Sequence, residues 1–472
     1  MAKDEPKIPT GRVRRAAKVG RLAGGQTARQ YATKAANLTR GEEARRAAAE
    51  KRQVEAAEQI FDVLGQMKGA AMKVGQVASF IDTGGLPPEF QERLQVKLAE
   101  LRDAAPRVSF KEMKKLMESE LDAPLKEVFS EFEQEAVAAA SIGQVYRARL
   151  ADADEGEGGR EVAVKVQYPG VASAVRADLQ NLGLIMRVAK RIAPGMDAKA
   201  MAAELRERLT DELDYEHEAQ SQRAFARAWK GHPFIYVPDV VTSLSTEKVL
   251  VSEWVDGVGF EGVREMDDAT RDRFGEIVFR FFFGSLYRHG HFSGDPHPGN
   301  YQLMPDGRVA FLDFGMTKRL TPERVADEVK AITLAMEEDA AGLRTHMAAM
   351  GFYDPEDEKV SPDAVLAHFQ DAAVWYLEDR ELTLDPKTAG QILIDFGDPR
   401  SEHWQLIRRG TAPPESLLSA RMQGLTLGVL GQLECTANWH RIACEWLFGD
   451  PPSTPLGERE AEYFGRGRRP AA

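Results

Sequence analysis

The chain is poor in the features that mark secreted, membrane-spanning and disulfide-bonded proteins. Only two of its 472 residues are cysteines, and no Cys/His cluster or CxxC pair accompanies them. Free thiols of Cys435 and Cys444 in a reducing compartment are therefore favoured over a disulfide or a metal site. No apolar run approaches the roughly 20 residues that span a bilayer, and the N-terminus lacks the apolar core of a secretory signal. From these absences we expect a cytoplasmic location.

Acidic charge dominates the chain, but it is unevenly placed. The net charge is −12, whereas residues 1–40 carry ten Lys or Arg against Asp4 and Glu5, a local balance of +8. This basic arm is either a solvated segment or a short amphipathic helix that contacts anionic lipid peripherally at a membrane surface. The acidic remainder lacks interleaved basic and aromatic residues, which argues against nucleic acid as a partner.

Patterning along the chain predicts an α+β protein. The predicted regions are a basic arm 1–42, a helical extension 43–120, a sheet-containing lobe 121–255, a helical lobe 256–450 and a tail 451–472. Strands that come first and helices that come after are typical of a small sheet lobe joined to a larger helical lobe. We expect the join near Glu253 to Gly257, where a strand pattern ends in Asp and Gly.

Local periodicity adds individual elements to this outline. The expected strands are residues 137–150, 162–168, 237–241 and 248–254, the first two as a hairpin around a glycine-rich acidic turn. Helical patterning covers about 173–228, and an amphipathic helix pair is predicted over 415–449. The apolar stripe of that pair comprises Met422, Leu425, Leu427, Leu430 and Leu433. We expect this stripe to pack against the helical lobe.

The strongest functional signal is the segment Gly294 to Asn300, which resembles a kinase catalytic loop. An Asp followed five residues later by an Asn lets the Asp295 carboxylate orient a nucleophile while the Asn300 amide oxygen binds a metal beside it. Thirteen residues after Asn300, Asp313 opens an Asp-Phe-Gly segment and offers a second metal ligand. Transfer of a γ-phosphate needs mainly positioning and charge neutralisation by magnesium. The predicted ligands are therefore ATP or ADP and magnesium.

Lys165 lies in the apolar strand pattern Val162 to Val166, where kinases carry the lysine that contacts the α- and β-phosphates. Without the downstream loop it would be an edge charge that extends to water. Its acidic partner is expected from a helix between the two motifs, and we predict Glu218 for this role. Glu216 and His217 are interpreted as a solvated face.

An alanine-rich loop stands one hairpin before Lys165, where protein kinases have a glycine-rich one. The Cβ of alanine restricts positive φ and the closest approach of backbone to phosphate, so this loop should cradle nucleotide differently. The predicted nucleotide contacts are Ala138, Ala139, Ala140, Ser141, Lys165, Glu253 and Val255.

In this order the motifs resemble the UbiB family of atypical kinases, which is associated with coenzyme Q biosynthesis. The resemblance covers about residues 55–320 and includes Lys73-Val74-Gly75-Gln76 as the KxGQ signature and Glu212-Leu213-Asp214 as the ExD element. It implies a bilobal protein-kinase-like fold whose N-terminal helical extension packs across the active site. Lys73 would meet Glu212 there and exclude protein substrates, which makes Lys73, Gln76, Glu212 and Asp214 regulatory residues.

The resemblance further implies ATP hydrolysis in support of coenzyme Q or related isoprenoid-lipid synthesis. Anionic lipid, an isoprenoid-lipid precursor and membrane-associated biosynthetic enzymes would be the partners. A separate observation agrees with the exclusion of peptides. Only a few residues separate Gly315 from Thr321-Pro322-Glu323, a predicted helix start with Pro in the first turn, which leaves little room for a peptide-binding activation loop.

Two other interpretations stay open at this point. Small-molecule kinases related to the aminoglycoside and choline kinases use a similar Asp-x-x-x-x-Asn loop, but they lack the KxGQ element. A pseudokinase that binds nucleotide as a structural ligand and acts as a scaffold would also retain the loops. The presence of all the polar residues favours an active enzyme over the scaffold.

Overall fold

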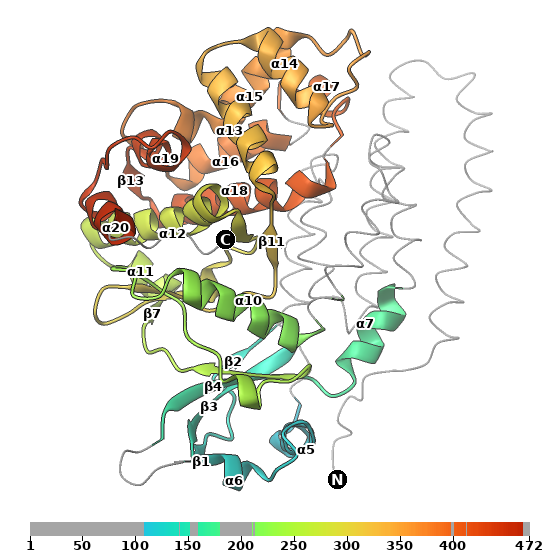
Figure 1. Ribbon diagram of the computed structural model, residues 1–472, viewed down its shortest axis with the longest axis vertical. Helices are drawn as coiled ribbons and strands as arrows, with labels where there is room; N and C mark the ends of the chain where they lie inside the picture. The colour runs from blue at the N-terminus through green and yellow to red at the C-terminus, as the bar shows by residue number, and fades with distance from the viewer. Residues whose placement is uncertain are drawn as a thin grey trace, which may run out of the picture. The chain divides into compact units, whose positions relative to one another are not determined.

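The computed structural model describes residues 108–140, 142–151, 159–179, 210, 213–397, 401–411 and 413–465. The chain divides into two compact units, and Figure 1 draws and labels their helices and strands. The first unit comprises Met1–Ser119, Val137–Gln144 and Val166–Leu213, and the second comprises Glu120–Ala136, Val145–Lys165 and Asp214–Ala472. The predictions for the basic arm, for nearly all of the helical extension and for Lys73, Gln76, Ser141 and Glu212 lie outside the described residues.

The described part of the first unit is small. Helix α5 (Phe110–Glu120) begins in it and buries Met113 and Met117, and strand β2 (Ala138–Ala139) and helix α7 (Val171–Leu179) follow along the chain. A tight turn closes after β2, because the backbone N–H of Ala140 donates to the Gly143 carbonyl at 2.9 Å. The expected alanine-rich loop is thus a short strand and a turn.

The first sheet contains the strands β1 (Phe129–Phe132), β3 (Gly143–Leu150), β4 (Glu161–Gln167) and β6 (Val249–Glu253), in the order β1-β3-β4-β6. The four-residue helix α6 (Leu125–Val128) precedes β1. Val162 and Val164 of β4 are fully buried, and because side chains alternate along a strand, Lys165 faces away from them. The strands predicted at 137–150, 162–168 and 248–254 are confirmed in β3, β4 and β6.

The strand predicted at 237–241 is wrong. The chain there forms only the two-residue β5 (Ile235–Tyr236), an isolated bridge between Val240 and Ser252, and the 3-10 turn η2 (Thr242–Leu244). Pro238 has no backbone N–H to give to a ladder, and the N–H of Asp239 donates to the Glu253 carboxylate at 3.0 Å. Neither Pro238 nor Asp239 can therefore donate a backbone N–H to a neighbouring strand.

Short strands continue in the second unit and position the loops of the site. A second sheet has the order β5-β10-β9-β7, with β7 (Val258–Gly259), β9 (Tyr301–Leu303) and β10 (Val309–Phe311). Two antiparallel pairs join β8 (His291–Ser293) to β11 (Thr317–Arg319), and β12 (Leu382–Thr383) to β13 (Thr436–Ala437). The 3-10 turn η3 (Pro298–Asn300) leads into β9.

Helices make up most of the second unit (Figure 1). They are α10 (Tyr215–Ala228), α11 (Phe260–Arg264), α12 (Asp268–His289), α13 (Pro322–Met336), α14 (Ala340–Ala349), α15 (Pro362–Leu377), α16 (Pro386–Gly397), α17 (Trp404–Ile407), α18 (Pro414–Leu433), α19 (Trp439–Leu447) and α20 (Pro455–Gly465). The predicted helix start before α13 is confirmed, because the Thr321 side chain caps it and Pro322 is its first residue. The small sheets and many helices confirm the predicted α+β class.

Helix α12 is the centre of the helical core. It begins at an Asp267 cap that accepts the N–H of Thr270, and it ends at Gly290, whose φ of 58° suits glycine. Every residue from Phe274 to Tyr287 is buried, so the helix is covered on all sides, as a core helix must be. Helices α18 and α19 and strand β8 pack against it.

The predicted helix pair at 415–449 is confirmed as α18 and α19. Four residues of the expected stripe are buried, but Leu425, at one edge of the stripe, remains 36% exposed. Cys435 and Cys444 are free, buried thiols. Among the described helices, none has the length and apolar character to cross a membrane.

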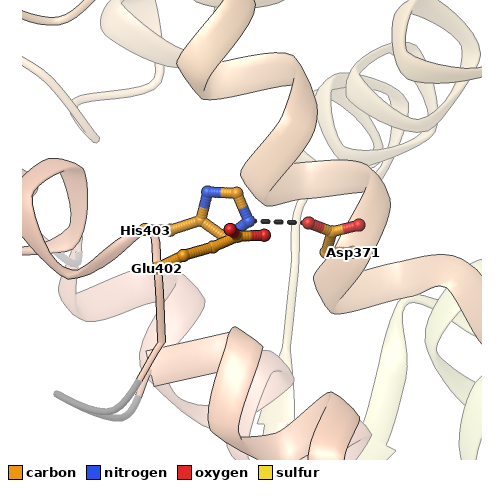
Figure 2. Close-up of side chains that lie close together, drawn as sticks. All are labelled: Asp371, Glu402 and His403. Atoms are coloured by element: carbon orange, nitrogen blue, oxygen red, sulfur yellow. Dashed lines mark hydrogen bonds and ion pairs between the residues drawn. The ribbon is translucent and has the colours of Figure 1, made fainter.

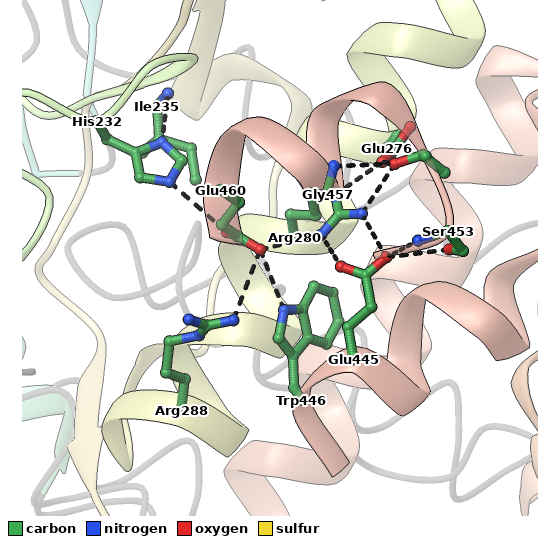
Figure 3. Close-up of polar contacts among 11 residues, drawn as sticks. His232, Ile235, Glu276, Arg280, Arg288, Glu445, Trp446, Ser453, Gly457 and Glu460 are labelled. Carbon is green, nitrogen blue, oxygen red and sulfur yellow. Dashed lines mark hydrogen bonds and ion pairs between the residues drawn. The ribbon is translucent and has the colours of Figure 1, made fainter. Parts of the chain in front are cut away.

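A buried cluster of charges attaches the C-terminal helix α20 to α12 (Figure 3). The Arg280 guanidinium, fully buried, donates to Glu276, Glu445 and Glu460 at 2.7 to 3.0 Å. Arg288 lies 3.8 Å from Glu460. The region beyond residue 450, predicted only as a tail, therefore contains a helix with a buried polar anchor.

Candidate active site

The site is built around Lys165 of strand β4. Its Nζ donates to Glu218 Oε1 of α10 at 2.6 Å and to Asp313 Oδ2 at 3.3 Å. The side chain of Glu218 is only 4% exposed and that of Lys165 17%. The ammonium also lies 5.1 Å from the centre of the Tyr215 ring, which adds a cation–π contact. The structure thus brings together a lysine and two carboxylates that are 53 and 148 positions away in sequence.

The charges around Lys165 decide its protonation. Burial by itself lowers the pKa of this lysine, but the carboxylates of Asp313 and Glu218 outweigh it and raise the pKa well above the usual value. The ammonium is therefore charged at neutral pH. A fixed positive charge in a poorly solvated place suits the binding of phosphate oxygens.

Helix α10 presents Glu218 on its buried side while its other side stays in solvent. It begins at Asp214, whose carboxylate accepts the N–H groups of Glu216 at 2.9 Å and His217 at 3.3 Å. Glu216 and His217 are exposed, as expected. Asp214, predicted as a regulatory residue, thus caps the helix that carries Glu218, and its regulatory role stays a prediction.

The Asp-Phe-Gly segment is tied to the same helix. The Phe314 ring is fully buried, with its centre 4.8 Å from that of Phe225 in α10. The backbone N–H of Gly315 donates to Asp313 Oδ1 at 3.0 Å and so leaves Oδ2 toward Lys165. An added Cβ on Gly315 would come within 3.4 Å of that Oδ1. These contacts fix the Asp313 carboxylate before any ligand binds.

Two backbone pairings bring the segments around Asp295 and Asp313 side by side. At one end the N–H of Gly294 donates to the Met316 carbonyl at 2.8 Å, which continues the pairing of β8 with β11. At the other end the N–H of Leu312 donates to the Asn300 carbonyl at 2.8 Å, which continues the pairing of β9 with β10. Asp295, Asn300 and Asp313 are therefore held between two backbone pairings.

Within this bracket Asn300 supports Asp295. Its amide nitrogen donates to the backbone carbonyl of Asp295 at 3.1 Å and to Oδ2 at 3.3 Å. Because the amide nitrogen is used in this way, the amide oxygen is the atom that could bind a metal. Amide and carboxylate oxygens are the ligands that Mg²⁺ prefers. Asn300 and Asp313 therefore fit a magnesium ion, which would neutralise the charge of a bound triphosphate.

An arginine that the sequence did not reveal contacts Asp295. Arg421 of α18 lies 3.2 Å from Asp295 Oδ1, and its Nε donates to the Gly294 carbonyl at 3.2 Å. Both side chains are nearly buried. The one available signal is that Arg421 is the only basic residue of a 20-residue helix, which is unusual for a purely apolar packing face.

Helix α18 also explains the glycine before Asp295. An added Cβ at Gly294 would collide with the Leu418 side chain, so a larger residue would require either Leu418 or the loop to shift. Many regulated kinases carry an arginine at the position before the catalytic Asp, whereas this chain has Gly294 there. Here an arginine reaches the loop from α18, through the contacts of Arg421 with Gly294 and Asp295.

The remaining predicted nucleotide contacts lie in different settings. Val255 is buried, and the Glu253 carboxylate is engaged by Tyr236 Oη at 2.6 Å, Asp239 N at 3.0 Å and Arg160 at 3.1 Å. These three contacts give the Glu253 carboxylate a structural role. Ala138 to Ala140 belong to the first unit and are described with it. Their roles, and those of the other site residues, stay predictions.

Comparison with known proteins places the chain in a family. The model of the ABC1 atypical kinase-like domain matches residues 100–347, more than half of the chain. The chain belongs to this family of AarF/UbiB-type atypical kinases. The matched residues include Lys165, Glu218, Asp295 and Asp313, but not Arg421.

Individual relatives agree with the family and with a kinase-like fold. The chain is 30% identical over 405 residues to atypical kinase COQ8B, mitochondrial, of Danio rerio, covering 84% of this chain and 60% of that protein. It is 30% identical over 368 residues to ACTIVITY OF BC1 COMPLEX KINASE 1, chloroplastic, of Arabidopsis thaliana, covering 76% and 52%. The complex structure of Rv3197–erythromycin from Mycobacterium tuberculosis matches with 33% identity and a TM-score of 0.60, over 84% of this chain and 97% of that chain. The chain spans about half the length of the curated relatives it matches.

Proposed function

We propose that this chain is a magnesium-dependent, kinase-like ATPase or phosphotransferase that supports coenzyme Q or related isoprenoid-lipid synthesis. The observation that carries the proposal is the contact of Lys165 with both Glu218 and Asp313. Structural ion pairs also occur in cores, but the order of this lysine and these carboxylates along the chain resembles that of kinases, which supports a phosphate-binding role. The kinase-like family membership supports the same reading.

Each residue has a role in this proposal. Lys165 binds the α- and β-phosphate oxygens, and Glu218 holds its ammonium in place. Asp313 and Asn300 would hold magnesium, which supplies charge neutralisation at the phosphates when bound. Asp295 orients the acceptor hydroxyl or water and can take its proton at the carboxylate. Because there is little covalent chemistry to perform, fixed geometry supplies most of the rate.

Arg421 is a positioning residue in this scheme. Its guanidinium holds one oxygen of Asp295 at 3.2 Å, while the Asn300 amide holds the other at 3.3 Å. Two donors on opposite oxygens fix the plane of the carboxylate. The carboxylate can then meet the acceptor without first losing rotational freedom.

The test is magnesium-dependent ATP turnover by the purified chain, measured beside two variants of one helix. Glu218→Gln should lose most of the turnover, because Lys165 then loses the charge of its nearer carboxylate and keeps only that of Asp313. Glu216→Gln, two residues away and exposed, should match the parent. Asp295→Asn should bind ATP but not turn it over. Full turnover in Asp295→Asn would refute the assignment of this site.

The acceptor and the partners form a separate part of the proposal. The resemblance to the UbiB family favours an isoprenoid-lipid precursor and a membrane-associated assembly, reached through peripheral contact with anionic lipid. Turnover should therefore rise with anionic liposomes and with a phenolic coenzyme Q precursor analogue. Equal turnover with and without both additions would leave the ATPase but remove the lipid assignment. ATP binding without turnover under every condition would favour the nucleotide-binding scaffold.

A second candidate function is the binding of a macrolide. The observation that favours it is the 33% identity to a structure solved in complex with erythromycin, over 97% of that chain. Saturable binding of erythromycin by the purified chain, followed by calorimetry in the presence and absence of ATP, tests it. If erythromycin shows no saturable binding either without ATP or with ATP at a saturating concentration, this candidate is excluded.

A further inference from the structure

A group of metal-ligating side chains lies outside the proposed active site. Asp371 of α15 and the adjacent pair Glu402 and His403, just before α17, each offer one ligand atom, and these three atoms lie within 4.8 Å of one another. Figure 2 shows the three side chains pointing toward one another from two separate segments. The Nε2 atom of His403 is 2.7 Å from Asp371 Oδ2.

Local structure holds this group in place. His403 is 10% exposed, and its backbone N–H donates to the Ser401 hydroxyl at 3.1 Å. Ser401 is itself buried, and its carbonyl accepts the N–H of Trp404 at 3.1 Å. Asp371 is 47% exposed and Glu402 is exposed. The imidazole is therefore largely shielded from solvent, whereas both carboxylates are accessible to it.

A second histidine stands beside the group and is poorly explained by packing alone. His368 is three residues before Asp371 on α15, so the two share a helix face. Its ring centre is 5.4 Å from that of His403. Two imidazoles bound to one tetrahedral zinc ion have ring centres about 5 Å apart, given a Zn–N distance of about 2.0 Å.

The Nε2 atom of His368 is buried and has no hydrogen-bond partner among the described residues. A buried polar atom without a partner costs about 1–3 kcal/mol. A metal ion bound at Nε2 would supply the missing partner.

We propose that Asp371, Glu402 and His403, with His368 beside them, bind a divalent transition-metal ion of the zinc class. Imidazole and carboxylate ligands suit zinc and its neighbours, whereas magnesium prefers oxygen alone. The ion would replace the 2.7 Å contact of His403 with Asp371 and would link α15 to the turn before α17. This site uses none of the residues that we assign to magnesium and ATP.

The test uses the full chain after removal of metal with a chelator, in saturating magnesium. Zinc binding is followed by calorimetry, and cobalt is added in parallel because its visible absorption reports tetrahedral coordination by nitrogen and oxygen. We expect uptake of one zinc ion per chain. His403→Ala, Asp371→Asn and His368→Gln should each weaken zinc binding by about 10-fold or more. The melting temperature of the parent should rise with zinc, because the ion binds the folded state.

A matched control is His346→Ala. His346 of α14 also faces a carboxylate, with its Nε2 3.9 Å from Asp327 Oδ1. Among the described residues, however, no third metal-ligating side chain joins this pair. It should bind zinc as the parent does, and so should Asp313→Asn, which removes the proposed magnesium ligand. Equal zinc affinity in His403→Ala and His346→Ala would overturn the proposal. So would loss of zinc binding in Asp313→Asn, or the absence of saturable uptake. Unchanged affinity in His368→Gln would remove His368 from the site.

Discussion

Replacing Glu460 by glutamine removes one negative charge from the buried cluster that attaches α20 to α12 (Figure 3). Burial alone raises the pKa of this carboxyl, but His232, Arg280 and Arg288 more than offset it and lower the pKa to about 2. The contact with His232, 3.6 Å long, is too long for a strong hydrogen bond, and burial lowers the pKa of His232 itself. Arg280 and Arg288, together with this His232 contact, hold Glu460 ionised at neutral pH.

The size of the effect follows from the pKa. A carboxyl with an ordinary value of 4.5 in the unfolded chain and about 2 in the folded chain contributes about 3 kcal/mol to the free energy of unfolding at pH 7. Because the folded value is the lower one, this contribution is present above about pH 5 and is lost as the pH falls toward 2. Glu460→Gln should lose about that amount at pH 7, since Gln still fits the space and can accept from Trp446 Nε1.

Urea unfolding measured by tryptophan fluorescence checks this expectation, because Trp446 lies 5.6 Å from the Arg280 guanidinium. The control is Glu458→Gln, which is exposed on the same helix and should change stability by less than about 0.5 kcal/mol. The gap between parent and Glu460→Gln should narrow between pH 5 and pH 3. A variant as stable as the parent at pH 7, or a gap that does not change with pH, would refute the reasoning.

Three further substitutions test the loop around Asp295 and the helix cap. Gly294→Ala forces its Cβ against Leu418 and should cost about 1–3 kcal/mol in urea unfolding, with part of the loss recovered by adding Leu418→Ala. Arg421→Ala should lower the turnover of ATP about 10- to 100-fold while calorimetry shows unchanged affinity for the nucleotide; a parallel loss of binding would contradict a positioning role. Asp214→Ala removes the cap of α10 and should cost about 1 kcal/mol of stability, whereas Asp214→Ser should restore most of it.

The parts of the site that follow a local pattern were predictable from sequence. Lys165 occupies a strand that buries alternate valines, and Glu218 is the carboxylate of α10 that turns toward it. Asn300 and Asp313 flank a hairpin, so their closeness follows once the hairpin is recognised. In each of these cases a short stretch of chain determines where the side chain goes.

The parts that depend on distant segments were not predictable in this way. Nothing near Asp295 in the sequence indicates that Arg421, 126 positions later, contacts its carboxylate. The predicted strand at 237–241 failed because the competing acceptor, Glu253, comes from another strand. The spacing of apolar residues in α18 showed which side is buried, but it could not show that Arg421 on that helix meets a charge.

The helices after residue 347 are therefore part of the site's construction, although the kinase-like family model ends there. Helix α18 supplies the Leu418 side chain against Gly294 and the Arg421 guanidinium on Asp295. Helices α19 and α20 supply Glu445 and Glu460 to Arg280, which would otherwise keep only Glu276 as a carboxylate partner among the described residues. A buried arginine with most of its partners removed is strongly destabilising. The matched segment alone would thus lack the Arg421 donor to Asp295 and most of the carboxylates that balance Arg280 in its central helix, so we expect the proposed reaction to need the chain through α20.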